Sequence, residues 1–248
     1  MNTGLLKRVI FMWTIGIVPI FDPCIHAQMT DRRQDFSIGL NIGVSLNTIN
    51  FQPIIKQNMK LGPVAGINAR YICEKYFNTI CGVQMELNYS MLGWTEDTEK
   101  SSVSYYRTMP YIQMPILMQL GWGKEKKGAK FIFEAGPQIG VSLGSFEHQQ
   151  GDDSQFVGST KQHDMKQDTY FDYGIIGGLG VEFSKNKRHF IVSARYYFGL
   201  ANVFDDSKKG VFARSAQQTI MMKCTYLYDI NSIADIKGIF KSKKKPNR

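Results

Sequence analysis

The chain has 248 residues, a net charge of +9, 43% hydrophobic residues, four cysteines and four histidines. The positive balance does not indicate a nucleic-acid partner, because it lies in turns and a tail without interleaved aromatic residues. No CxxC pair and no Cys/His cluster with zinc spacing is present, so the sequence predicts neither a metal site nor a cofactor.

The first segment has the pattern of a secretory signal peptide, which we assign to residues 1–27. Lys7 and Arg8 precede an apolar run over 9–21, and His26-Ala27 supplies part of a small-residue cleavage site. The run of about 13 residues is shorter than the ~20 that a spanning helix needs. We therefore expect an exported protein, with a barrel domain over 28–228 and a basic periplasmic tail over 229–248.

Alternation of apolar with small or polar residues recurs across the rest of the chain. The first run, FSIGLNIGVSL over 36–46, shows it most clearly. A period of two predicts β-strands, because successive side chains of a strand point to opposite faces. Eight such runs are present: 36–46, 61–73, 81–93, 107–122, 130–144, 169–183, 190–200 and 215–227.

The connections between these runs alternate between long and short, and the three short ones contain lysine. Long external loops and short periplasmic turns are typical of outer-membrane barrels. A soluble eight-stranded barrel would instead place its apolar face inside. Strand length, export and glycines on the polar face favour the membrane arrangement. The sequence predicts an all-β fold, an eight-stranded antiparallel up-and-down transmembrane β-barrel in the outer membrane.

Charged residues on the polar face are expected to point into a narrow lumen. A buried unpaired charge costs several kcal/mol, so we expect opposite charges to pair there. The predicted structural network lies in the periplasmic half of the lumen and consists of Arg70, Glu86, Glu134, Glu182, Arg195 and Lys223. Such a network would plug the pore.

Two further structural expectations concern cysteines and aromatic residues. Cys73 and Cys81 flank a short connection and form a candidate disulfide in an oxidising compartment. Aromatic residues near strand ends, among them Trp94 and Trp122, fit the girdles that line both membrane interfaces.

The chain resembles the PorT-type family of outer-membrane β-barrels. The resemblance is a diffuse pattern of glycine, aromatic and proline positions, carried by the segments 62–71, 86–94, 111–123, 134–145, 172–183 and 194–204. It implies an eight-stranded barrel in the outer membrane. The founding member is associated with a secretion system that serves surface proteins and gliding. The resemblance carries over no catalytic residue.

The functional expectation is a non-enzymatic, monomeric barrel that contacts outer membrane lipids and other envelope or secretion-system proteins. It would be a structural, binding or envelope/secretion-assembly component. A narrow porin is one alternative. The other is a membrane-barrel hydrolase that uses the loop 145–168, where His148 and His163 lie among several aspartates. A GxSxG match over 140–144 continues a strand and lacks the turn into a helix that a nucleophile needs.

Overall fold

The computed structural model describes residues 35–76, 79–96, 104–124, 127–150, 163, 165, 167–204 and 212–230. The predicted signal peptide and all of the tail beyond 230 lie outside these residues. No helix long and apolar enough to cross a membrane occurs in the described part of the chain. The strands are β1 Asp35–Gln52, β2 Gln57–Tyr76, β3 Thr79–Glu96, β4 Ser104–Gly123, β5 Lys127–Ser142, β6 Phe146–Gln150, β7 Phe171–Lys185, β8 Arg188–Asn202 and β9 Arg214–Ile230.

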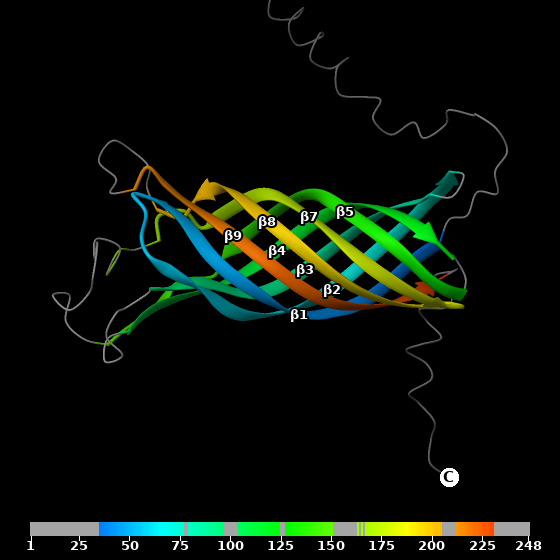
Figure 1. Ribbon diagram of the computed structural model, residues 1–248, viewed down its shortest axis with the longest axis horizontal. Helices are drawn as coiled ribbons and strands as arrows, with labels where there is room; N and C mark the ends of the chain where they lie inside the picture. The colour runs from blue at the N-terminus through cyan, green and yellow to red at the C-terminus, as the bar shows by residue number, and fades with distance from the viewer. Residues whose placement is uncertain are drawn as a thin grey trace, which may run out of the picture. The chain divides into compact units, whose positions relative to one another are not determined.

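Eight of these strands close into a ring, as the sequence predicts (Figure 1). Each ring strand pairs antiparallel with the next, β5 pairs with β7, and β1 pairs with both β2 and β9. The short strand β6 lies outside the ring sequence and pairs with the first residues of β4. We call the end with the tight β2–β3, β4–β5 and β7–β8 connections the short-turn end, and the opposite end the loop end.

The observed strands run further toward the loop end than the alternation predicts. Pairing of β1 with β9 continues to Phe51–Ser215 and Gln52–Arg214, although residues 47–52 and 214 were expected to lie in loops. The reason is that backbone pairing does not require alternating side chains. In the extension of β1 the apolar residues Ile49 and Phe51 lie on the inward parity, which is small or polar earlier in the strand, so the alternation of the wall ends although the ladder continues.

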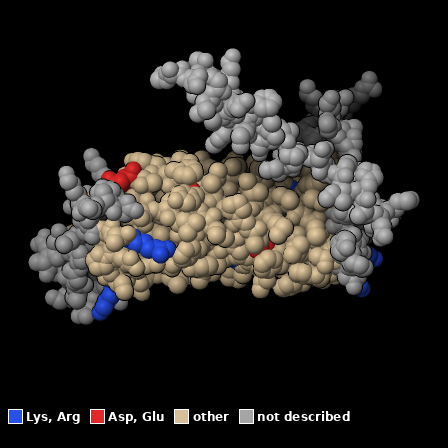
Figure 2. Space-filling model, turned by 90° about the horizontal axis from the view of Figure 1, so that it is seen from above, with Lys and Arg blue, Asp and Glu red and all other residues tan. Residues whose placement is uncertain are grey.

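The apolar face of every ring strand points outward, which confirms the membrane arrangement predicted from the sequence. Along β1 the exposed side chains include Leu40 and Ile42, whereas Ser37, Asn41 and Ser45 are buried inside. Uncharged residues cover most of the barrel wall seen in Figure 2. Because strand closure satisfies the backbone hydrogen bonds, such a wall can face lipid.

The candidate disulfide between Cys73 and Cys81 is not formed in the structure. Cys81 lies opposite Glu74, and Cys73 falls at a register shift between Ile72 and Glu74. The β-bulge displaces Cys73 from the position across from Cys81, so this sequence-based expectation does not hold here.

Candidate functional site: the filled lumen

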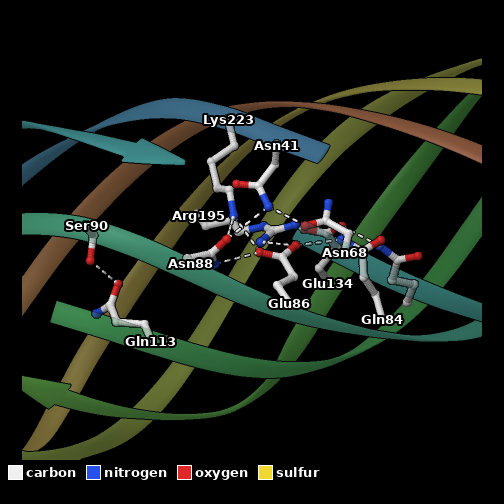
Figure 3. Close-up of polar contacts among 11 residues, drawn as sticks. Asn41, Asn68, Gln84, Glu86, Asn88, Ser90, Gln113, Glu134, Arg195 and Lys223 are labelled. Atoms are coloured by element: carbon white, nitrogen blue, oxygen red, sulfur yellow. Dashed lines mark hydrogen bonds and ion pairs between the residues drawn. The ribbon is translucent and has the colours of Figure 1, made fainter. Parts of the chain in front are cut away.

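Four of the six predicted network residues meet near the middle of the barrel, and we call them the central charged group: Glu86, Glu134, Arg195 and Lys223. Arg195 donates from Nε to Glu134 Oε2 at 2.6 Å and from Nη1 to Glu86 Oε1 at 2.9 Å (Figure 3). Lys223 Nζ donates to the other oxygen of Glu86 at 2.5 Å. All four side chains are buried, and two positive charges balance two negative ones.

Amide side chains surround the central charged group and complete its hydrogen bonding. Gln119 Nε2 donates to Glu134 Oε1 at 2.6 Å, and Gln84 Nε2 donates to Glu86 Oε1 at 2.6 Å. Asn88 donates to the second Glu86 oxygen at 2.9 Å. Carboxylates with this many donors are held in fixed positions, so the group blocks the middle of the lumen.

The other two predicted residues, Arg70 and Glu182, belong to a second set near the short-turn end. We call this set the short-turn charged group: Arg70, Lys130, Glu182, His189 and Asp229. Glu182 accepts from Arg70 Nη1 at 2.6 Å and from Lys130 Nζ at 2.8 Å. His189 bridges Glu182 at 2.6 Å and Asp229 at 2.8 Å. Ser37 of β1 donates to Asp229 of β9 at 2.5 Å, which ties the first and last strands together.

All six predicted residues therefore point into the lumen, but the ion pairs described here divide them into two groups. The expectation of one network confined to one half of the barrel is corrected accordingly. Sequence reasoning missed His189 and Asp229 because they were assigned to a turn and a tail. Parity would have found them: His189 shares the inward parity of Arg195, and Asp229 shares that of Lys223.

Ser184 lies beside the short-turn charged group, so a serine, a histidine and an aspartate come together there. Ser184 Oγ lies 3.0 Å from His189 Nδ1, but Glu182 Oε1 lies closer to the same nitrogen, at 2.6 Å. With a carboxylate at each ring nitrogen, His189 donates from both and has no lone pair to accept the Ser184 proton. A nucleophilic triad needs that acceptor. The arrangement is a hydrogen-bonded cluster that links β7, β8 and β9.

The loop end of the lumen is filled by apolar and aromatic side chains. We call this set the aromatic cluster: Ile49, Phe51, Ile55, Leu92, Trp94, Tyr105, Met109, Tyr111, Val203, Phe204 and Phe212. Trp94 packs edge-on against Phe51 at 5.4 Å and against Phe204 at 6.2 Å, measured between ring centroids. Trp94 was expected in an interfacial girdle, and that expectation is wrong, because its side chain is 0% exposed. Trp122, at 41% exposed, does face outward.

Arg107 covers part of the aromatic cluster at the loop end. Its guanidinium lies over the rings of Trp94 and Phe204, at 5.6 and 5.2 Å from the centroids. It donates to the Met165 carbonyl at 2.6 Å, hydrogen-bonds Ser145 and pairs with Glu147. A cation over aromatic faces in a desolvated site adds to the packing.

The two histidines of the loop 145–168, on which the hydrolase alternative depends, pack against opposite faces of β4. His148 stacks on the exposed Tyr106, whereas His163 stacks on the buried Tyr105 with Nε2 3.1 Å from Glu96. Neighbouring residues of a strand point to opposite sides, so the histidines do not share a site. No group of three or more metal-ligating side chains occurs in the described part of the chain.

Together, the outward apolar wall, the closed ring and the filled interior define a small membrane-embedded β-barrel. The chain belongs to the outer membrane protein beta-barrel domain family, whose model matches residues 26–205. The protein is accordingly an outer membrane protein. Because barrels of this kind have short periplasmic turns, the short-turn end faces the periplasm.

Comparison with the curated proteins finds no match. Among solved structures, the chain is similar to the attachment invasion locus protein Ail of Yersinia pestis, with 13% identity, a TM-score of 0.34, and coverage of 78% of this chain and 98% of that one. It is also similar to the Neisserial surface protein NspA, with 9% identity, a TM-score of 0.43, and coverage of 79% of this chain and 97% of that one. For OprG of Pseudomonas aeruginosa the identity is 8%, the TM-score is 0.40, and the coverage is 81% of this chain and 98% of that one.

Proposed function

We propose that this protein is a structural, binding or envelope/secretion-assembly component that acts through its surfaces. The observation that carries the proposal is the filled lumen. The short-turn charged group, the central charged group and the aromatic cluster occupy successive levels of the interior. An eight-stranded barrel has an interior that side chains can fill completely, which leaves the outer surfaces for function. No catalytic residue and no cofactor enter the proposal.

The proposed partners are outer membrane lipids and other envelope or secretion-system proteins, with the barrel itself a monomer. Lys185, Lys187 and Arg188 are exposed at the β7–β8 turn and would present positive charge to a periplasmic partner. The PorT-type resemblance supports a secretion-assembly role. Closure of the ring supports the monomer, because no ring strand offers a free edge to a second copy.

The purified barrel is expected to give no ion conductance in planar bilayers, because charged and aromatic side chains block its interior. A narrow porin is the competing function, and it predicts reproducible single-channel steps. The measurement is current recording after reconstitution, with a known outer-membrane porin as the positive control. Stable open-channel steps from the folded protein would refute the closed-lumen proposal.

A periplasmic assembly partner should be lost when the basic turn is neutralised. We expect that crosslinking in intact outer membranes captures envelope proteins with the unaltered chain, and that Lys185→Gln/Lys187→Gln/Arg188→Gln reduces the capture severalfold. The matched control is Phe146→Ser/His148→Ser, which changes exposed residues at the loop end. Equal capture by both variants would argue against contact through the turns.

The hydrolase alternative depends on the loop 145–168. Its two histidines lie on opposite faces of β4, so either would have to act without the other. A lipid- or peptide-cleaving activity of the purified barrel that either His148→Ala or His163→Ala abolishes would favour this alternative over the proposed function.

A further inference from the structure

Three exposed cations lie side by side on neighbouring strands at the short-turn end of the barrel. Lys127 of β5 pairs directly with Lys185 of β7, and Lys185 pairs directly with Arg188 of β8. All three side chains are exposed, and we call them the basic row. Directly opposed residues of an antiparallel pair have Cβ atoms about 5 Å apart, so the three positive charges are close neighbours.

The basic row faces sideways, toward the membrane, and not into the lumen. Its members share strand parity with the exposed wall residues Phe183 and Phe190, whereas the residues that alternate with them are buried. Phe183 and Phe190 are a directly opposed pair, and Lys185 and Arg188 are the next outward pair of the same two strands. Two residues of a strand span about 7 Å. The cations therefore lie just beyond the apolar wall, where lipid headgroups begin.

Aromatic residues flank the basic row on the same outward face. Tyr228 of β9 is directly opposite Arg188 and shares the parity of the exposed Tyr226. On the other side, Trp122 of β4 stacks with Phe131 of β5, with ring centroids 6.3 Å apart. Tyrosine and tryptophan are enriched where a membrane meets water, which supports this depth for the basic row.

The carboxylates of the chain do not neutralise the basic row. Like charges directly opposite each other destabilise a sheet, and two such pairs are adjacent here. Glu182 of β7 and Asp229 of β9 are buried in the short-turn charged group, and Asp35 of β1 has an interaction of its own, two strands away from β8. Glu125 lies outside the described residues, and the lysines of the same turn outnumber it. An anion from outside the chain would therefore stabilise this end of the barrel.

We propose that the basic row binds the phosphate headgroup of an anionic phospholipid in the periplasmic leaflet of the outer membrane. The inference deepens the proposed function and rests on it, since membrane lipids are among the proposed partners. The phosphate would lie between the Lys185 ammonium and the Arg188 guanidinium, both of which are phosphate-binding groups. The acyl chains would lie along Phe183 and Phe190. An acidic soluble partner would gain nothing from this apolar wall, which favours a lipid.

The test is native mass spectrometry of the folded barrel, purified in a neutral detergent and titrated with lipid. The probes are dioleoylphosphatidylglycerol, dioleoylphosphatidylcholine and glycerol 1-phosphate. The two lipids share their acyl chains and differ in net charge, and glycerol 1-phosphate is a soluble headgroup without chains. We expect a saturable complex with one phosphatidylglycerol, binding of phosphatidylcholine weaker by about tenfold or more, and no complex with glycerol 1-phosphate.

A triple variant separates the basic row from general attraction to a basic protein. Lys127→Gln/Lys185→Gln/Arg188→Gln should fold, because all three side chains are exposed, and should lose the preference for phosphatidylglycerol. The charge-matched control is Lys243→Gln/Lys244→Gln/Lys245→Gln, in the tail outside the described residues. It lowers the net charge by the same amount and should keep the preference.

The single variant Lys127→Glu tests the role of the opposed like charges. It places a carboxylate across from Lys185, so we expect higher thermal stability in neutral detergent and severalfold weaker binding of phosphatidylglycerol. The β7–β8 turn, on which the crosslinking experiment depends, is unaltered in this variant, so the lipid site and the protein contact can fail separately.

Four results would overturn the lipid site. They are equal binding of the two lipids by the unaltered chain, a complex with glycerol 1-phosphate of equal strength, an unchanged preference in the triple variant, and an equal loss in the tail control. Capture of envelope proteins through the turn without any lipid preference would assign the basic row to a protein partner, and the proposed function would stand.

Discussion

Replacing Glu86 with alanine is expected to lower the free energy of unfolding by about 3–5 kcal/mol, because it leaves a buried ammonium without a carboxylate. Glu86 accepts from both Arg195 and Lys223. In the variant, Arg195 retains Glu134, but Lys223 keeps only the amide oxygen of Asn88, at 3.3 Å. The measurement is urea unfolding of the reconstituted barrel, monitored by circular dichroism.

The double variant Glu86→Met/Lys223→Met is the control for this experiment. It removes one charge of each sign and leaves the Arg195–Glu134 pair intact. Apolar replacement of a buried ion pair is often neutral or stabilising, so most of the lost stability should return. If the double variant is as unstable as Glu86→Ala, lost packing and not an unpaired charge determines the cost.

Replacing Trp94 with alanine is expected to destabilise the loop end by about 3–5 kcal/mol, the usual cost of deleting a large buried aromatic side chain. Trp94 contacts Phe51, Tyr105 and Phe204 and lies under the Arg107 guanidinium. Its removal opens the interior at the loop end. The measurements are unfolding in urea by circular dichroism and protease sensitivity of the loop connections.

Trp122→Ala is the matched control, because both tryptophans lie near strand ends. Trp122 faces outward and is 41% exposed, so its removal should cost much less than that of Trp94. Equal losses for the two variants would contradict the inward position of Trp94.

Much of the interior could be predicted from parity along single strands. Residues that alternate with the apolar wall point inward, and this rule placed Glu86, Glu134 and Arg195 correctly. Trp94 was misassigned because its place near a strand end was given more weight than its parity, which matches that of Glu86. The extension of β1 toward the loop end gave no such signal, since its apolar residues Ile49 and Phe51 lie on the inward face.

The sequence by itself determined that eight amphipathic strands form a barrel with an apolar outer wall, because side-chain alternation is a local property of each strand. Only the tertiary structure decided which charges meet. Arg70 on β2 and Glu182 on β7 are not neighbours in the sheet and are 112 residues apart in the chain. Their contact depends on the tilt and closure of all the strands, which bring opposite walls of a narrow lumen together.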